Sequence, residues 1–409
     1  YSNGDDPGHL KWNYITTSSY RIIYPQGCDS LAKNYGINME KFHIAESISS
    51  GLIPGEGYKR KTPVILHAFH GISNGMVTWA PKRADLYTLP EAYNPNPIPW
   101  VTDLAVHESR HLAQMQFGYK GWLRPLTWIL GDMAIGAYSA IWPNNWFLEG
   151  DAVTAETALT KAGRGRSADF LDYYMAAFEN GDTRNWYRWR YGSYRYYTPD
   201  HYALGYMTIA GARYCFNDPL FTERYFSRIA TNPFRFFNTQ KTMKSASGKS
   251  FKDSFSLIMN EFSNIWKEER KSHEPFTETT SVQNPSKWFQ KMYGNISLDG
   301  KIYSICSGIA ESSYLTEYDP STGILSRLRP FASGTSRLRA GGEYLWWSES
   351  IPDERWSLKM DSKIFRYNPK NGKTQALTHS GRFFNPNPSP DGNTITAVEY
   401  PSTGGTFII

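Results

Sequence analysis

The segment LAVHESRHLAQMQ, residues 104–116, contains the pattern His-Glu-x-x-His, whose residue types can bind a metal ion. His107 and His111 are four residues apart, so on a helix both imidazoles project from the same side. Two ring nitrogens placed in this way can reach one zinc ion. Glu108 lies at the flank of such a site, where it can act as a general base without being a ligand. The pattern therefore predicts a zinc site, and the alternative is an amphipathic helix that carries two histidines by coincidence.

A catalytic zinc site needs three protein ligands and one position left for water. The segment NNWFLEGDAVTAET, residues 144–157, offers the third ligand in Glu149, which we expect to open a helix. Gly150 and Ala152 are small, and we therefore expect this helix to lie close against the helix that carries the histidines. Taken alone, Glu149 would be an ordinary acid favoured by the dipole of a helix N-terminus. It becomes a candidate metal ligand only in combination with the two histidines.

The two segments together resemble the gluzincin zinc metallopeptidases. In that family His-Glu-x-x-His is followed by an aromatic-x-Glu-Gly-x-Ala segment, which WFLEGDAVTAE matches, and by a further acid, which matches Glu156. Two tyrosines come later, and YTPDHYALG supplies Tyr197, Tyr202 and Gly205. The likeness to the peptidase MA-like proteins, of the clan of aminopeptidase N and leukotriene A4 hydrolase, covers nearly the whole chain.

The resemblance implies a zinc-dependent peptidase of α+β fold that hydrolyses peptide bonds through a metal-activated water, with the glutamate of His-Glu-x-x-His as general base. It also implies that the Tyr202 hydroxyl supports the oxyanion of the transition state. His201, beside it, is a second candidate donor, and we predict that Tyr197 and His201 contact the substrate. Asp103, one turn before the first histidine, and Glu156 compete for the role of orienting an imidazole from behind.

Exopeptidases of this clan carry a GxMEN-type strand whose glutamate binds the free amine of the substrate. The segment NGMVTWAP, residues 74–81, lies where that strand would be and contains no acid. We therefore expect an endopeptidase rather than an aminopeptidase, acting on a peptide or protein substrate. The segment NWYRWRYGSYRYYTPD, residues 185–200, interleaves arginines with aromatic residues, which favours a wall of the substrate cleft. A packed loop is the alternative for that segment.

Two other kinds of function stay open from the sequence. The first is a non-catalytic binding or scaffold protein, in which the C-terminal region and an inherited metallopeptidase domain recognise a protein or glycan partner. The second is a hydrolase with the same site that acts on an epoxide or another non-peptide bond. The presence of Glu108, which a scaffold would not need, favours an enzyme.

The N-terminal two thirds of the chain has the pattern of a small sheet and many helices. The expected elements are strands at 18–25 and 62–69, an edge strand with its loop within 74–90, and helices at 29–48, from Pro99 onward and across 147–268. The most apolar segment, residues 121–142, is interrupted by charged residues and a proline. We interpret it as a buried helical hairpin, with a membrane-facing role as the alternative.

The composition turns polar around residues 268–286, so we predict a metallopeptidase domain over 1–275 and a second domain over 287–409. The second domain has short alternating strands and two series of repeated turns: YDPSTG and YNPKNG, and SLDGKIYSI, RAGGEYLWW and SPDGNTITAVEY. A period of roughly 40 to 50 residues indicates β-propeller blades. These repeats resemble the TolB or WD40-like type. We expect an incomplete propeller that continues beyond this chain, and a β-sandwich is the alternative.

The composition limits the other classes of function. The 409 residues are 40% hydrophobic and include 14 Trp, 28 Tyr and 22 Phe, enough for a large core. The net charge of +6 is spread along the chain and indicates no nucleic-acid partner. Three cysteines predict neither a disulfide framework nor a thiolate metal cluster. The chain starts at Tyr1 without a leader, so we expect a missing targeting segment and a secreted, periplasmic or cell-surface bacterial protein, with no transmembrane segment in this chain.

Overall fold

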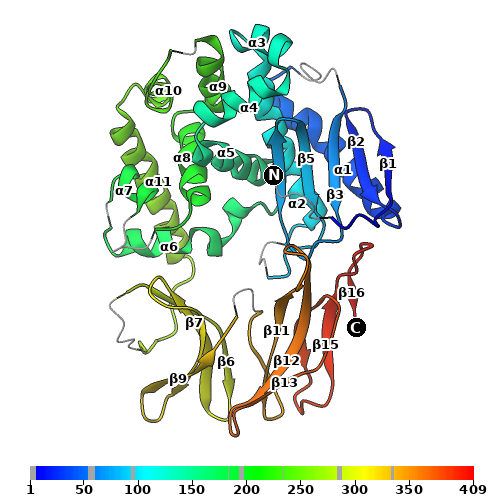
Figure 1. Cartoon of the computed structure of the whole chain (residues 1–409). Helices are drawn as coiled ribbons and strands as arrows, with labels where there is room; N and C mark the ends of the chain where they lie inside the picture. The colour runs from blue at the N-terminus through cyan, green and yellow to red at the C-terminus, as the bar shows by residue number, and fades with distance from the viewer. Residues whose placement is uncertain are drawn as a thin grey trace.

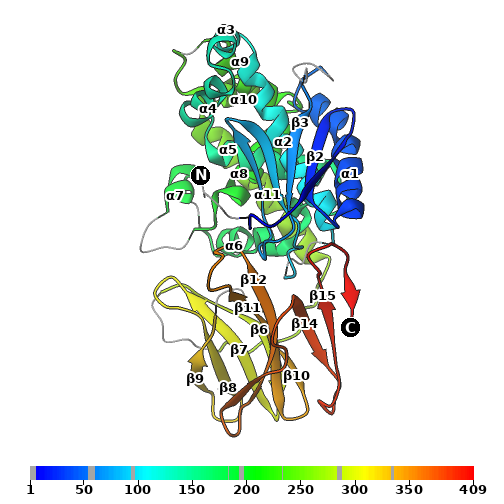
Figure 2. The same cartoon turned by 45° about the vertical axis from the view of Figure 1, so that its right-hand side comes forward.

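The computed structural model has helices and a mixed sheet in its N-terminal part and several antiparallel sheets in its C-terminal part (Figure 1). The turned view of Figure 2 shows the same separation between an upper helical part and the lower sheets. The structure describes residues 6–53, 60–93, 97–182, 184–192, 198–232, 234–282, 288–332 and 336–409.

The first sheet contains five strands in the order β1-β2-β3-β5-β4. Their bounds are β1 Trp12–Thr16, β2 Tyr20–Pro25, β3 Thr62–His67, β4 Gly75–Trp79 and β5 Lys82–Tyr87. β2, β3 and β5 run parallel, whereas β1 and β4 are antiparallel to their neighbours. The expected edge strand within 74–90 is β4. The rest of that segment, predicted as a loop, forms β5 inside the sheet, because Ala84 and Leu86 pack into the core.

Helices α1 (Asp29–Ser49) and α2 (Trp100–Gln116) share a core with this sheet. Side chains along a strand alternate between the two faces of a sheet. Leu66 of β3 is fully buried in the core with the helices, so its neighbour His67 points to the opposite face. Asp85 of β5 lies on that opposite face by the same alternation. The sheet therefore separates α2 from a second set of polar side chains.

The block from residue 123 to 271 is mainly helical, as its periodicity predicts. Its elements are α3 Leu123–Leu130, α4 Asp132–Ile141, α5 Asn145–Leu159, α6 Ala168–Glu179, α7 Trp186–Tyr191, α8 His201–Cys215, α9 Phe221–Thr231, α10 Asn238–Ser247 and α11 Phe251–Lys271, with short 3₁₀ turns η1 Phe117–Tyr119 before it and η2 Arg164–Arg166 within it. The core of this block is aromatic, and the rings of Phe147 and Tyr225 stack with their centroids 3.7 Å apart.

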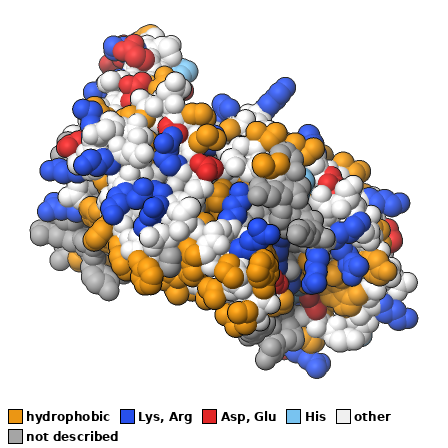
Figure 3. Space-filling view, turned by 90° about the horizontal axis from the view of Figure 1, so that it is seen from above, with side chains coloured by type: hydrophobic (Ala, Val, Ile, Leu, Met, Phe, Trp, Pro, Cys, Tyr) orange, Lys and Arg blue, Asp and Glu red, His pale blue; other side chains and the backbone are white. Residues whose placement is uncertain are grey.

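Helices α3 and α4 form the expected hairpin, but the prediction that the hairpin is buried is wrong. Five of its large hydrophobic side chains are between 54% and 80% exposed: Trp128, Ile129, Leu130, Met133 and Ile141. Figure 3 looks onto the end of the molecule where these helices lie. The segment is apolar around more of its circumference than the core can cover, so only one face of each helix is buried.

Three antiparallel sheets follow, in the strand orders β6-β7-β8-β9, β10-β11-β12-β13 and β14-β15-β16. Their bounds are β6 Gln290–Leu298, β7 Lys301–Gly308, β8 Tyr314–Asp319, β9 Ile324–Pro330, β10 Arg339–Gly341, β11 Tyr344–Pro352, β12 Met360–Asn368, β13 Lys373–Ala376, β14 Phe383–Pro388, β15 Ile395–Glu399 and β16 Phe407–Ile408. In the described residues they form no closed barrel.

The repeated turns of the sequence fall at equivalent places in these sheets. Gly300, Gly342 and Gly392 lie between the first two strands of their sheets, each with φ between 58° and 76°. Gly323 and Gly372 lie between the third and fourth strands, both with φ of 70°. These positive φ values are the ones that tight hairpin turns between antiparallel strands require.

The junction between the two parts falls near the predicted boundary. The last helix ends at Lys271 and the next strand begins at Gln290. Two separate domains, over 1–275 and 287–409, stay a prediction. Within the described ranges no helix is both long enough and apolar enough to span a membrane.

Candidate functional site

The predicted metal ligands converge on one point. His107 and His111 lie on successive turns of the buried helix α2, and their rings meet edge to face with centroids 4.9 Å apart. The Nε2 atoms of both rings lie 3.3 Å from Oε2 of Glu149. The three residues offer ligand atoms within 4.8 Å of one another, a spacing that one ion could satisfy. The imidazoles are 10% and 11% exposed and the carboxylate is 22% exposed, so the group is partly accessible to solvent.

Glu149 lies in the second turn of α5 and does not open the helix, which begins at Asn145. Trp146 and Phe147, which precede Glu149, lie in the first turn of this helix and are buried. Burial would raise the pKa of Glu149, but the contacts with His111 and His107 outweigh it and lower the pKa far below its usual range. A charged carboxylate that faces two imidazoles is in the protonation state that a metal ligand requires.

Glu156 holds the ring of His107 from behind. Nδ1 of His107 lies 3.1 Å from Oε2 of Glu156 and 2.8 Å from Nη2 of Arg164, and Arg164 donates to both oxygens of Glu156, at 2.7 and 3.0 Å. Burial would raise the pKa of Glu156, but Arg164 and His107 lower it to about 2. Burial also works against a charge on His107, whereas Glu149 and Glu156 raise its pKa to about 10. The bond to Glu156 fixes the ring so that Nε2 faces Glu149.

A buried ion pair joins α2 to α5. Arg110 is fully buried and donates through Nε and Nη2 to the two oxygens of Asp151, at 2.7 and 2.8 Å. Gln114 donates to Asp151 at 2.9 Å and to the carbonyl of Leu148 at 3.0 Å. The side-chain oxygen of Gln114 lies 2.9 Å from Nδ1 of His111. Gln114 therefore orients this imidazole while it links the two helices.

Glu108 lies beside the imidazoles, outside the ligand group. It is buried, and its Oε2 has no hydrogen-bond partner among the described residues. Burial raises the pKa of Glu108, and the charges of His111 and His107 oppose that effect. Gly75 of the edge strand β4 packs directly on this carboxyl group, because a Cβ there would collide with Oε1. A buried carboxyl with a raised pKa and an unpaired oxygen is suited to accept and return a proton.

Tyr202 reaches the site on α8, which packs very closely on α5. A Cβ on Gly205 of α8 would fall 2.9 Å from Cα of Gly150. We predicted that Gly150 lets α5 lie close against α2, and this is wrong. Gly150 instead packs against Gly205, so the close contact that it allows is between α5 and α8. Tyr202 then lies nearly parallel to His107, with ring centroids 6.4 Å apart. Burial and the charge of Glu149 raise the pKa of the Tyr202 hydroxyl.

The other predicted site residues differ in their placement. His201 adjoins Tyr202, with ring centroids 4.9 Å apart. Asp103 is buried one turn before His107, but its Oδ1 has no hydrogen-bond partner among the described residues. The carboxylate contact behind His107 therefore comes from Glu156 of α5 and not from Asp103. Tyr197 lies outside the described residues.

The arginine-rich aromatic segment, residues 185–200, contains two kinds of residue. Trp186 and Trp189 of α7 are buried in the helical core, whereas Tyr191 is exposed. Residues 193–197 lie outside the described part of the chain. The described tryptophans thus pack as core residues, whereas Tyr187 and Tyr191 of α7 are exposed.

Comparisons with known proteins found no relative from which a role for these residues could be inferred. No protein-family model matches the chain, and no curated protein matches it. The interpretation of the site therefore depends on its own side chains and their contacts.

Three residues that support the site escape sequence reasoning: Arg110, Gln114 and Arg164. Arg110 and Gln114 each follow a motif histidine by three residues, so they project beside the imidazoles. A charged residue on a buried helix face predicts an ion pair, and this signal could have found Arg110. Arg164 lies in η2, after the end of α5, and no spacing rule connects it with Glu156.

Proposed function

We propose that this protein is a zinc-dependent peptidase that hydrolyses internal bonds of extended peptides. The observation that carries the proposal is the convergence of His107, His111 and Glu149, with the buried carboxyl of Glu108 beside them. This donor set fits zinc, which takes imidazole nitrogen and carboxylate oxygen and, in catalytic sites, keeps one position for water. The resemblance of the sequence to the gluzincins implies the same arrangement.

The three ligands would hold the ion, which when bound would acidify a water molecule and polarise the scissile carbonyl. The chain's own side chains move the protons. Glu108 takes a proton from the attacking water and passes it to the leaving amine. The hydroxyl of Tyr202 donates a hydrogen bond to the oxyanion, where charge develops only in the transition state. The raised pKa of Tyr202 keeps this donor protonated.

The edge strand β4 supports a peptide as the substrate. β4 is the last strand of the sheet order, and its Gly75 packs on the carboxyl group of Glu108. An extended peptide can add to a sheet edge through main-chain hydrogen bonds. A peptide paired in this way would pass beside the base. The strand sequence GMVTW contains no acid that could bind a free amine, which favours an endopeptidase.

We further propose that the C-terminal sheets are blades of a β-propeller. Their repeated glycine turns at equivalent places support this, and such modules can carry a binding surface for a protein or glycan partner.

The test is hydrolysis of a denatured protein, with new amino termini counted over time. Zinc-loaded wild type should cleave it, and Glu108→Gln should lower the rate by about 10²–10⁴-fold, because the general base is lost. The variant should bind as much zinc as wild type. Glu40→Gln, a matched change on α1 outside the site, should leave the rate unchanged. Equal rates for wild type and Glu108→Gln would contradict the proposal, and zinc binding without cleavage would favour the scaffold alternative instead.

A further inference from the structure

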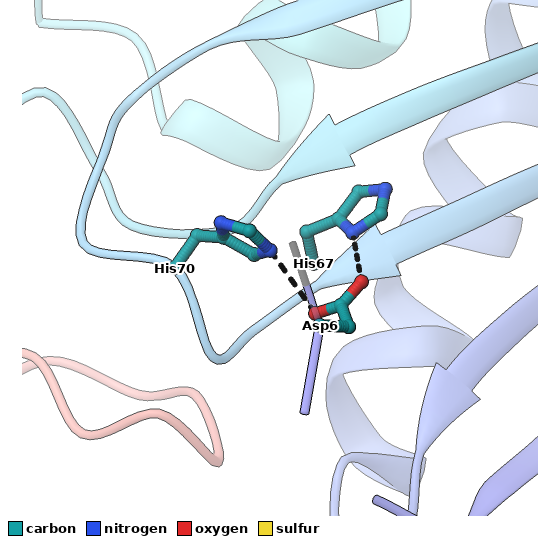
Figure 4. Close-up of side chains that lie close together, drawn as sticks. All are labelled: Asp6, His67 and His70. Carbon is teal, nitrogen blue, oxygen red and sulfur yellow. Dashed lines mark hydrogen bonds and ion pairs between the residues drawn. The ribbon is translucent and has the colours of Figure 1, made fainter. Parts of the chain in front are cut away.

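Figure 4 shows a second group of two histidines and one carboxylate. By the alternation along β3, it lies on the face of the first sheet opposite α2. Nδ1 of His67 lies 2.8 Å from Oδ2 of Asp6, and Nε2 of His70 lies 3.0 Å from Oδ1 of the same carboxylate. His67 ends β3, His70 follows in the next loop, and Asp6 comes from the N-terminal segment. All three residues offer ligand atoms within 4.8 Å of one another.

A further carboxylate, that of Asp85, contacts the second ring nitrogen of His67, as carboxylates commonly do behind metal-bound histidines. Nε2 of His67 lies 3.1 Å from Oδ1 of Asp85, and Arg83 donates to Asp85 through Nε at 2.8 Å. A metal-bound imidazole usually donates its second ring N–H to such an acceptor, which fixes the tautomer and the ring orientation. With Nε2–H as the donor, the lone pair of Nδ1 faces Asp6. Tyr87 stacks on the same ring, with centroids 4.9 Å apart.

The ligand types and their exposure indicate which ion would fit. The side chains of Asp6 and His67 are 18% and 13% exposed, whereas that of His70 is 1% exposed. An ion at this place would have protein ligands on one side and access to water on the other. Imidazole nitrogen with carboxylate oxygen suits zinc and its first-row neighbours, whereas calcium and magnesium prefer oxygen ligands.

We propose that Asp6, His67 and His70 form a second metal site, for a divalent first-row transition ion such as Zn²⁺. The ion would fasten the N-terminal segment to the end of β3. The C-terminal sheets also hold this loop, because Arg382 donates to the carbonyl of His70 at 2.9 Å. The second site would lie at the junction of the two parts, and it does not depend on peptidase activity.

The test is the zinc content of the whole chain after equilibration with Zn²⁺ and removal of unbound metal. Wild type should carry two ions per chain. Asp6→Asn, which keeps the side-chain size, should carry one, His111→Ala should carry one, and the double variant none. Asp353→Asn is the matched control, because Asp353 is 22% exposed and pairs with Lys359, and it should keep two.

The possible results separate the two sites. One ion in wild type that His111→Ala removes and Asp6→Asn retains would overturn the second site and leave the peptidase site intact. One ion that only Asp6→Asn removes would support the second site and overturn the first. Near-ultraviolet circular dichroism of each variant checks that a lost ion does not reflect a lost fold.

An independent observation concerns the end of the molecule formed by α3, α4 and the connection from α9 to α10 (Figure 3). Eight large hydrophobic side chains there are more than half exposed: Trp128, Ile129, Leu130, Met133, Ile141, Phe234, Phe236 and Phe237. The two segments meet, because the backbone N–H of Trp122 donates to the carbonyl of Ala230 at 3.2 Å. Ile141 also lines one depression together with Phe236 and Phe237. We call this set the apolar end.

The apolar end is also basic. Residues 224–252, from α9 to the start of α11, contain seven lysines and arginines and no acid. Asp132 is the one acid of residues 121–142, and it accepts a hydrogen bond from the backbone N–H of Lys82. The guanidinium of Arg124 lies 5.7 Å from the ring centre of Trp128. Figure 3 shows Lys and Arg side chains among the hydrophobic ones on this face.

We infer that the apolar end docks on an anionic lipid surface. Large exposed apolar patches on a soluble fold mark interaction sites, and aromatic and aliphatic side chains beside lysines and arginines are typical of segments that lie in a bilayer interface. Trp128 and Ile129 would enter the headgroup boundary, while the basic residues of 224–252 face lipid phosphates. The positive charge selects an anionic surface.

The test is sedimentation with vesicles of phosphatidylcholine alone or mixed with phosphatidylglycerol. Wild type should bind the mixed vesicles, less so at high salt, because salt screens the charges. Trp128→Ser combined with Ile129→Ser should weaken binding by about tenfold or more, since two large apolar side chains are lost. The matched control is Ile37→Ser combined with Ile44→Ser on α1, where the two side chains are 68% and 58% exposed.

The control should bind as wild type does. Equal binding by the two double variants would overturn the inference. A concentration-dependent dimer that Trp128→Ser combined with Ile129→Ser abolishes, without vesicle binding by wild type, would also overturn it and would assign the apolar end to a second copy of the chain.

Discussion

Two groups of the same ligand types lie in this chain, on opposite faces of one sheet. They are the helix group, His107, His111 and Glu149, and the strand group, Asp6, His67 and His70. The helix group takes both histidines from adjacent turns of α2 and its carboxylate from α5. The strand group joins residues that are 61 and 64 positions apart in the sequence. The same ligand set can thus be built from local spacing or from tertiary folding alone.

The surroundings of the two groups differ more than their ligands do. Beside the helix group, Glu108 keeps a buried oxygen without a hydrogen-bond partner among the described residues. In the strand group and its support, Asp6 and Asp85 both contact His67 and Arg83 holds Asp85, while Nδ1 of His70 is buried without a partner among the described residues. An unpaired buried carboxyl oxygen is costly, so one that lies beside a group of metal ligands is a candidate for chemistry there. Ligand types therefore indicate where a metal can bind, and the neighbouring groups indicate what it does there.

The largest expected effect concerns the support of the helix group. Arg110→Met leaves Asp151 charged, buried and without its main partner, so the free energy of unfolding should fall by about 3–5 kcal/mol. Urea denaturation measures this loss. Arg83→Met, beside the strand group, should lower the free energy of unfolding clearly less, because Arg83 is partly exposed and His67 still contacts Asp85. Equal losses in the two variants would remove the contrast between the two supports.

The next effect concerns Tyr202, the proposed oxyanion donor beside the helix group. Tyr202→Phe should lower kcat by about 10²–10³-fold, with KM and zinc content little changed, because the lost hydrogen bond forms in the transition state. Steady-state kinetics on a peptide substrate measures this. Tyr206→Phe, on the same helix with its hydroxyl near the Gly165 carbonyl, is the matched control. Unchanged kinetics in Tyr202→Phe would show that this ring only packs.

The smallest expected effects are on metal affinity, and they should be reciprocal. Glu156→Gln should weaken zinc binding at the helix group by about 10–100-fold and leave the strand group unchanged, because Glu156 orients His107. Asp85→Asn should weaken zinc binding at the strand group and leave the helix group unchanged, because Asp85 contacts His67. Competition with a chromophoric chelator measures both affinities. A variant that weakened both sites alike would indicate a general loss of fold, and the supporting roles would then be wrong.

Much of the helix group and its setting can be predicted because it depends on local spacing. The strand pattern at 18–25, the helix at 29–48 and the helix after Pro99 appear in the structure as β2, α1 and α2. Periodicity does not say which partner covers an apolar segment, so the exposure of residues 121–142 is missed. The same limit applies to Gly150, since only the packed structure shows that it meets α8 and not α2.

The strand group lies beyond prediction from this sequence. His67 and His70 are separated by three positions, and on a strand and loop that spacing carries no geometric meaning for a metal site. Asp6 belongs to a segment without periodicity, and its approach to β3 depends on the folding of the whole sheet. Arg164 is missed for a similar reason, because the turn after α5 brings it back to Glu156.

The most direct test of the proposed metallopeptidase site is an anomalous difference map, recorded on either side of the zinc absorption edge from crystals grown with Zn²⁺. We predict a peak about 2.0–2.2 Å from Nε2 of His107, Nε2 of His111 and the carboxylate of Glu149, without a fourth protein ligand. The absence of a peak between these three side chains, or a shell closed by four protein ligands, would contradict the assignment.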